Sequence, residues 1–236
     1  MLLDILLPPN VPRKIVCVTG AGGKTTLITT LAREAKAQNL RCAIATTTHY
    51  YAFSQTDFYD GSGNSAAQLD AVRAQLELGN VVYTGTPTGE RKLCACGNAM
   101  WQTLLLHSDT VLIEVDGSSR LPIKFPRAGE PVLPPHTDAI LVVMGLSALG
   151  KKLCDVCHRY PLVCDALSCA PDVLVTPALL AQIVTRGYGD LPQMQAVLNQ
   201  ADVCPPALAA ETQALLSAHF KTHLISAQKG CCSCSF

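Results

Sequence analysis

Two patterns of apolar residues alternate along the chain. Short apolar runs rich in β-branched residues predict buried strands at 14–19, 41–46, 110–115, 139–144 and 172–175. Shorter runs predict further strands at 81–84, 195–198 and 223–225. Apolar residues at helical spacing, with capping and breaking residues at the ends, predict helices at 24–38, 66–78, 98–106, 177–187 and 206–220. Because strands and helices alternate, the sequence predicts an α/β fold.

The first strand, first helix and second strand form a βαβ unit, which requires parallel strands. We therefore expect a P-loop NTPase-like three-layer open sheet of mostly parallel strands, with helices on both faces. Polar and glycine-containing segments predict a loop at 55–63 and a turn at 85–89. A single domain is expected over 1–227, followed by a Cys-rich, poorly ordered tail at 228–236.

Composition narrows the class of protein. Hydrophobic residues make up 49% of the chain and charged residues 15%, which is typical of a globular protein. The net charge is zero, which argues against a general binder of nucleic acid or acidic membranes. The first nine residues lack the basic region of a secretory signal, and no run of about 18 apolar residues occurs. We expect a cytoplasmic protein.

The chain has twelve cysteines at scattered positions. Two close pairs, Cys94 with Cys96 and Cys154 with Cys157, could be half-sites for zinc, although a closed zinc site requires a workable spacing between the pairs. Cys154 to His158 also matches the pattern for c-type haem attachment, which requires an exported protein. We interpret that match as a coincidence.

The segment between the first strand and the first helix carries the strongest chemical signal. It consists of Gly20, Ala21, Gly22, Gly23, Lys24, Thr25 and Thr26. Glycines let backbone N–H groups turn towards phosphate oxygens, and the helix N-terminus adds positive potential. Lys24 is predicted to reach the β- and γ-phosphates, and the Thr25 hydroxyl is predicted to ligate Mg²⁺.

The spacing of this loop departs from the full Walker A pattern. That pattern requires a glycine at position 18, where this chain has Val18. The remaining short form resembles the phosphate loop of the Mur ligase and folylpolyglutamate synthase group. An ordinary glycine-rich turn is the alternative. It is disfavoured because strand, glycines, Lys-Thr and helix follow one another in the order that phosphate binding needs.

Two acidic residues, Glu114 and Asp116, end the predicted strand at 110–115 and precede Gly117. An apolar strand that ends in an acid is typical of a Walker B element, whose carboxylate holds Mg²⁺ or orients the attacking water. Alternation along the strand places both side chains on one face. The sequence does not decide which acid binds the metal. The alternative is an acidic strand end that turns at Gly117.

Hydroxyl residues follow the second strand, where Thr46, Thr47 and Thr48 precede His49. Ligands gather at the carboxyl ends of parallel strands, so these hydroxyls are predicted to lie beside the phosphate loop and to contact the γ-phosphate or a metal-bound water. His49 could act as an acid or base, because an imidazole titrates near physiological pH. An alternative stays open, in which the threonines merely end the strand and His49 is a hydrogen-bond donor with a structural role.

Asn199 and Asp202 follow the strand predicted at 195–198. Their spacing resembles the Asn-Lys-x-Asp element with which many GTPases bind guanine, where the aspartate accepts from N–H groups of the base. Gln200 stands where the lysine is usual, and Ser226 with Ala227 resembles a Ser-Ala segment of the same proteins. Both ATP and GTP remain candidate ligands.

Basic residues follow the acidic strand at Arg120, Lys124 and Arg127. They lie near the predicted ligand edge of the sheet and could bind a ligand there. The alternative is a solvated charged loop, the commoner situation for such residues.

Several segments in order resemble the YqeC family of accessory proteins of selenium-dependent molybdenum hydroxylases. They are 20–26, 46–49, 114–124, 130–134, 145–150, 158–159 and 199–202. The resemblance spans roughly residues 4 to 227 and implies a role in maturing a selenium-containing molybdenum cofactor. It implies the hydroxylase and other maturation proteins as partners, and a pyranopterin phosphate or a selenium donor as candidate ligands of Arg120, Lys124 and Arg127. Gln200 and the Cys-rich tail depart from the family pattern.

These observations predict an NTP-hydrolysing accessory protein that uses Mg²⁺ with ATP or GTP. The residues predicted to carry catalysis are Lys24, Asp116, Glu114 and His49, and those predicted to bind the metal are Thr25, Glu114 and Asp116. Neither nucleic acid nor a membrane is expected as a partner. Two alternatives are an ATP-dependent ligase or kinase-like activating enzyme, and a non-hydrolysing scaffold switched by nucleotide.

Overall fold

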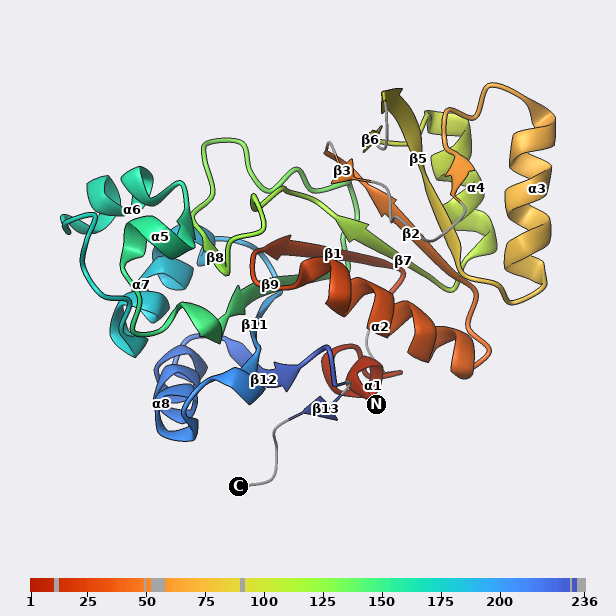
Figure 1. The fold of residues 1–236 in the computed structure, drawn as a ribbon. Helices are drawn as coiled ribbons and strands as arrows, with labels where there is room; N and C mark the ends of the chain where they lie inside the picture. The colour runs from red at the N-terminus through yellow and green to blue at the C-terminus, as the bar shows by residue number, and fades with distance from the viewer. Residues whose placement is uncertain (11–12, 49, 52–57, 90–91, 230, 233–236) are drawn as a thin grey trace.

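The computed structural model describes residues 1–10, 13–48, 50–51, 58–89, 92–229 and 231–232. Within these residues an 11-stranded sheet forms the centre of the molecule, and helices cover both of its faces (Figure 1). The strand order is β13-β12-β11-β9-β1-β7-β2-β5-β6-β3, with β4 beside β5. The predicted α/β fold with a mostly parallel sheet is confirmed.

Parallel strands form the middle of the sheet, and short strands form its edges. The parallel strands are β1 (Ile15–Gly20), β2 (Cys42–Thr46), β5 (Val82–Gly89), β7 (Thr110–Glu114), β9 (Ala139–Gly145), β11 (Met194–Asn199) and β12 (Lys221–Ser226). The short strands at or next to the edges are β3 (Tyr50–Tyr51), β4 (Tyr59–Asp60), β6 (Lys92–Cys94) and β13 (Cys231–Cys232), and β6 lies between β5 and β3. A separate pair joins β8 (Ile123–Lys124) to β10 (Cys157–His158).

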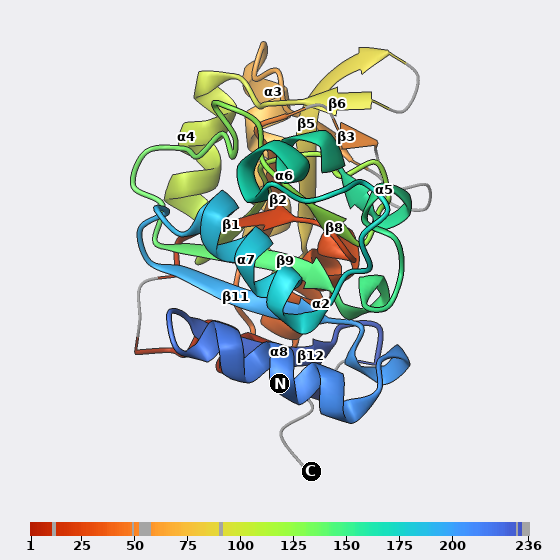
Figure 2. The ribbon, with the colours of Figure 1, turned by 90° about the vertical axis from the view of Figure 1, so that its left-hand side faces the viewer.

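The helices form the outer two layers. They are α1 (Leu2–Leu6), α2 (Lys24–Ala37), α3 (Ala66–Glu77), α4 (Asn98–His107), α5 (Leu153–Val156), α6 (Tyr160–Leu167), α7 (Pro177–Tyr188) and α8 (Pro206–Ser217). Two 3₁₀ turns, η1 (Leu146–Ala148) and η2 (Ala201–Val203), follow β9 and β11. Helices α1 and α2 pack on one face of the sheet, and α3, α4, α7 and α8 pack on the other (Figures 1 and 2). None of the helices in the described ranges is long and apolar enough to cross a membrane.

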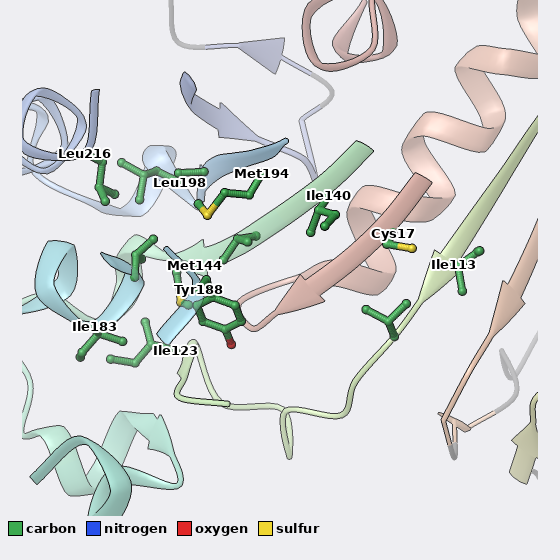
Figure 3. Packing of buried hydrophobic residues seen from close by; sticks show 14 of the residues in the cluster. Cys17, Ile113, Ile123, Ile140, Met144, Ile183, Tyr188, Met194, Leu198 and Leu216 are labelled. Carbon is green, nitrogen blue, oxygen red and sulfur yellow. The ribbon is translucent and has the colours of Figure 1, made fainter. Parts of the chain in front are cut away.

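Alternation along each central strand divides the core in two. In β1, Ile15 and Cys17 join the cluster under α7 and α8, whereas Val16 and Val18 join the cluster under α2. Figure 3 shows residues of the first cluster, among them Cys17 and Tyr188. Both faces are buried, which explains why the parallel strands are continuous apolar runs in the sequence.

Strand β1 lies where the chain changes direction within the sheet. From β1 the chain passes through α2 to β2 on one side, whereas β9, β11 and β12 lie on the other side. In an open α/β sheet such a reversal leaves a crevice at the carboxyl ends of the strands. Figure 2 shows the order of these strands from the side of the molecule. The loops that follow β1, β7, β9 and β11 therefore meet at one edge.

Three sequence predictions of secondary structure are wrong. The loop predicted at 55–63 contains the short strand β4, because Tyr59 and Asp60 pair with β5. Residues 172–175 form no strand, and Leu174 makes only an isolated bridge to Lys152, because Pro171 and the cap of α7 at Thr176 leave too little chain between them. Residues 85–89 continue β5 instead of turning, because they pair with the short strand β6. The register of this pairing shifts between Pro87 and Gly89, beside a residue that has no N–H to donate.

Helix α1 and strand β13, the first and last elements of the chain, lie near one another in Figure 1. Helix α1, which the sequence pattern does not predict, buries four leucines against α2: Leu2, Leu3, Leu6 and Leu7. Within the tail expected at 228–236, the backbone of Cys231–Cys232 pairs with β12 in an antiparallel direction. Residues 230 and 233–236 lie outside the described residues.

The N-cap of α7, Thr176, predicts how much one hydrogen bond contributes to the stability of the fold. The Thr176 hydroxyl accepts a hydrogen bond of 3.1 Å from the Leu179 N–H, and Pro177 occupies the first helical position. Thr176→Ala should lower the free energy of unfolding by about 1 kcal/mol, because the N–H loses its acceptor. Urea denaturation would measure the loss, and Thr176→Ser should retain most of the stability. Equal losses in the two variants would contradict a capping role.

Candidate functional site

The loop between β1 and α2 packs directly on the backbone of β9. Three glycines of the loop have positive φ angles, which residues with a Cβ rarely adopt. The angles are 89° at Gly20, 81° at Gly22 and 109° at Gly23. A Cβ on Gly20 would lie 2.2 Å from the Val143 carbonyl oxygen, and one on Gly22 would lie 2.3 Å from the Gly145 nitrogen. The glycines therefore serve close packing against β9 as well as the turn itself.

Lys24 begins α2, and its amine lies beneath the loop. Its Nζ donates to the Gly20 carbonyl oxygen at 2.7 Å. It also lies 3.2 Å from Oδ1 of Asp116 and 3.5 Å from Oε1 of Glu114. Lys24 is only 3% exposed. The first residue of the helix is thus paired with both acids that the sequence places at the end of β7.

Asp116 connects the start of the loop to the segment after β7. Its Oδ2 accepts hydrogen bonds from the Thr19 hydroxyl at 2.8 Å, the Gly20 N–H at 3.2 Å and Nζ of Lys124 at 2.7 Å. Its Oδ1 forms the ion pair with Lys24 but has no hydrogen bond of good geometry among the described residues. At 1% exposure, Asp116 is a structural anchor of the loop.

Glu114 faces the first turn of α2. Its Oε2 lies 3.3 Å from the hydroxyl of Thr25, which donates to it. Burial raises the pKa of the Glu114 carboxyl, and the charge of Asp116 raises it further against the opposing effect of Lys24. A hydroxyl and a carboxylate therefore stand together at the end of β7, and both are the hard oxygen donors that Mg²⁺ prefers.

A chain of buried charges continues from Asp116 away from the loop. Lys124 is completely buried, and its Nζ lies 2.7 Å from Oε2 of Glu130. Arg159 donates to both oxygens of Glu130, and the Arg127 guanidinium lies 3.0 Å from one of them. Burial raises the pKa of Glu130, but the hydrogen bonds and charges of Arg159 and Lys124 outweigh it and lower that pKa to about 2.

The predictions for the basic residues after β7 need correction. Lys124 is neither a solvated side chain nor free to contact a ligand, because its amine is enclosed between Asp116 and Glu130. A lysine among apolar neighbours, Ile123 and Phe125, was the available signal of burial. Arg120 and Arg127 are exposed.

The threonines after β2 lie at the end of β7, as expected for neighbouring parallel strands. The Thr46 hydroxyl donates to the carbonyl oxygen of Glu114 at 2.9 Å, and the Thr47 N–H donates to the same oxygen at 3.3 Å. The Thr47 hydroxyl donates to the Val132 carbonyl oxygen, and the Thr48 N–H donates to the Thr46 hydroxyl. These bonds join the two strand ends. His49 lies outside the described residues, so its role stays a prediction.

Asn199 joins the loop at 20–26 to the end of β12. Its amide donates to the Gly22 carbonyl oxygen at 2.9 Å and accepts from the Ala227 N–H at 2.9 Å. Asp202 lies one turn further along, in η2. Its backbone N–H donates to the Ser226 hydroxyl, which in turn donates to its carboxylate, both at 3.1 Å. The structure thus brings both predicted residues to the same edge as the loop.

Most of these site residues lie in the part of the chain that matches a known protein family. The model of the family described as YqeC protein matches residues 16–161. The chain belongs to the YqeC family. One relative, named Uncharacterized protein YqeC, from Escherichia coli (strain K12), is 28% identical over 179 residues, which cover 74% of this chain and 69% of the relative. The matched region includes the loop, both acids and the charge chain to Arg159, whereas Asn199 and Asp202 lie beyond it.

Sequence reasoning about this YqeC-family chain assigned no role to Thr19, Glu130, Arg159 or Tyr188. The ring of Tyr188 is buried in the cluster shown in Figure 3. Burial raises the pKa of its hydroxyl, and the charges of Asp116 and Glu130 raise it further. Glu130 and Arg159 lie in segments that carry the family resemblance, but no local pattern indicates the partners of these four residues, which come from distant segments.

The cysteine pairs do not assemble into a metal site in the part of the chain that the structure describes. No group of three or more His, Cys, Asp or Glu residues there has a metal-binding arrangement. Burial raises the pKa of Cys96 to about 11 and that of Cys157 to about 12. These thiols are therefore poor sources of thiolate at neutral pH.

The close approach of the loop to β9 predicts a large effect of one methyl group. Gly22→Ala should lower the free energy of unfolding by about 3 kcal/mol, because the new Cβ would meet the backbone of Gly145 and Pro122 at a positive φ. Gly117→Ala is the matched control, since a Cβ there meets nothing within 4 Å. Urea denaturation of both variants would test this, and similar stabilities would contradict the packing described.

The depressed pKa of Glu130 predicts how stability depends on pH. Its stabilising contribution is present above its ordinary value of 4.5 and is lost as pH falls from there towards about 2. Glu130→Gln should therefore destabilise the protein at pH 7 by about 3 kcal/mol, from a shift of that size. Denaturation from pH 7 to pH 3 should show the gap between wild type and variant narrowing below about pH 4.5. A constant gap would contradict the role of the charge.

Proposed function

We propose that this YqeC-family protein binds a nucleoside triphosphate with Mg²⁺ on the loop at 20–26 and hydrolyses it. The observation that carries the proposal is the meeting of two elements at the end of β1. Lys24 and Thr25 from the start of α2 contact Glu114 and Asp116 from the end of β7. A cation, a hydroxyl and acidic residues next to a glycine loop and a helix N-terminus are the groups that phosphoryl transfer requires.

The two acids are suited to different tasks. Oδ2 of Asp116 already accepts three hydrogen bonds, so this acid would hold the loop and Lys24 in position. Glu114 contacts Thr25, so this pair would hold Mg²⁺. Protein sites for Mg²⁺ commonly supply only one or two side chains, and phosphate oxygens and water complete the shell. When bound, the ion would offset negative charge on the β- and γ-phosphates.

The position of Lys24 is coupled to that of the loop. The carboxylate that accepts from the Gly20 N–H also pairs with the Lys24 amine, so loop and cation share one anchor. Lys24 would stabilise the negative charge of the phosphates while water attacks the γ-phosphorus and the bond from that phosphorus to the β-phosphate oxygen breaks. Such fixed charges need no rearrangement during the reaction and therefore lower its barrier.

The biological setting is a separate part of the proposal. The resemblance to accessory proteins of selenium-dependent molybdenum hydroxylases supports a role in maturing such a hydroxylase or its cofactor. Hydrolysis would then drive a change of conformation or the delivery of a cofactor. The relative from Escherichia coli is similar over most of its length, but its name supplies no activity.

Hydrolysis of ATP and GTP by the purified protein tests the proposal. The wild type should release phosphate only with Mg²⁺, and Lys24→Ala should lower the rate by about 100-fold, because the charge on the phosphates loses its buried cation. Thr25→Ala should raise the Mg²⁺ concentration needed for half the maximal rate. Phosphate release over a series of Mg²⁺ concentrations measures both effects.

Thr103→Ala on α4 is the control for Thr25→Ala, because its hydroxyl donates to the Ala99 carbonyl oxygen of its own helix. Thermal unfolding would show that each variant is folded. If the wild type neither binds nor hydrolyses any nucleotide, the proposal is wrong. Tight binding without turnover would favour a nucleotide-switched scaffold, and a phosphorylated or adenylated small molecule would favour an activating enzyme.

A further inference from the structure

A second polar cluster lies beside the phosphate loop, at the carboxyl ends of β11 and β12. We call it the β11–β12 cluster, and it consists of Asn199, Asp202, Ser226, Ala227 and Lys229. Both strands lie on the side of β1 opposite β2, where the reversal of direction opens the crevice. A nucleotide with its phosphates on the loop at 20–26 therefore has this cluster within the same edge of the sheet.

Within the cluster, Asn199 is the residue that contacts the loop. It is 3% exposed, and both ends of its amide are used, by the Gly22 carbonyl oxygen and by the Ala227 N–H. A Cβ on Gly23 would lie 2.6 Å from its nitrogen, so loop and amide are in contact. A buried amide held by a hydrogen bond at each end has little freedom to move. The segments that carry Asp202 and Ser226 are thereby held in register with the phosphate loop.

Asp202 is oriented by Ser226. The Ser226 hydroxyl is 3% exposed, accepts from the Asp202 N–H and donates to Oδ1 of the carboxylate. The other oxygen, Oδ2, lies 3.3 Å from Nζ of Lys229, whose side chain is 61% exposed. A carboxylate has about four acceptor sites, so each oxygen can accept a further hydrogen bond. The side chain of Asp202 is 22% exposed, which leaves it accessible to a ligand.

The charge of Asp202 is maintained at neutral pH. Burial raises its pKa, but the hydrogen bonds from Lys229 and Ser226 outweigh that effect and lower the pKa. The residue is therefore an acceptor with no proton to donate.

Gln200 adds an unsatisfied acceptor next to this cluster. Its side chain covers Gly145, where a Cβ would lie 2.4 Å from Oε1. That oxygen is buried and has no hydrogen-bond partner within the described ranges. Buried acceptors are nearly always satisfied, so this oxygen is an exception that lies beside the β11–β12 cluster.

We propose that the nucleotide is a guanine nucleotide and that the Asp202 carboxylate binds the base; this inference rests on the proposed nucleotide site. Guanine presents two adjacent donors, N1–H and the N2 amino group, which match the two oxygens of a carboxylate. Adenine presents the lone pair of N1 at the corresponding edge, which a carboxylate repels. Charge-assisted hydrogen bonds of this kind are about twice as strong as neutral ones. Asp202 therefore favours guanine and disfavours adenine through one group.

Equilibrium binding of three nucleotides to the full chain tests the inference. Calorimetry with the β,γ-imido analogues of GTP, ATP and xanthosine triphosphate avoids turnover. The wild type should bind the GTP analogue at least about tenfold more tightly than the ATP analogue, as expected for two charge-assisted hydrogen bonds. Asp202→Asn should remove that preference and bind the xanthosine analogue most tightly, because the carbonyl at position 2 of xanthine accepts from the asparagine amide.

Asp172→Asn is the matched control, since this exposed aspartate lies far along the chain from the cluster, before α7. It should leave all three affinities unchanged, and thermal unfolding should show that both variants are folded. Equal affinities of the wild type for the ATP and GTP analogues, unchanged by Asp202→Asn, would overturn the guanine inference and leave the nucleotide site standing. Absence of binding by all three would overturn both.

Discussion

The buried carboxylate of Asp116 holds three parts of the chain in one arrangement. It accepts from the backbone where β1 becomes the loop, pairs with the first residue of α2 and bonds the lysine of β8. A buried charge is costly unless it is paired and hydrogen-bonded, so these partners depend on one another. Glu130 and Arg159 extend the arrangement to the start of α6, which packs on α7. Lys124 connects the carboxylates of Asp116 and Glu130.

This dependence links the proposed chemistry to the stability of the fold. The glycines of the loop can approach β9 only because they lack side chains, and Asn199 adds a bond from the opposite side of the loop. The loop is thus held from β7, β9 and β11 before any ligand arrives. Such preorganisation is what binding and stabilisation of a triphosphate need, because groups already in place lose little freedom on binding.

The strand order explains why these groups meet. Three loops that are far apart in the sequence follow β1, β7 and β11, and parallel pairing brings their starting points to one edge. The proposed phosphate, metal and base contacts would then lie along that edge, from Glu114 through Lys24 to Asp202. The segment that matches the YqeC family includes the proposed phosphate and metal contacts. The β11–β12 cluster lies outside that segment.

Local pattern alone determined most of the long elements, because a strand buried on both faces must be apolar and an amphipathic helix must repeat every 3.6 residues. It also identified Lys24, Thr25 and Glu114, whose spacing in a strand-loop-helix unit is set by the backbone. Short elements such as α1 and β8 escaped prediction, since packing rather than periodicity forms them. Only the tertiary structure showed that Asp116 anchors the loop whereas Glu114 contacts Thr25, and that Lys124 is enclosed between two carboxylates. Burial and pairing depend on residues that folding brings together from distant positions, and no local spacing encodes them.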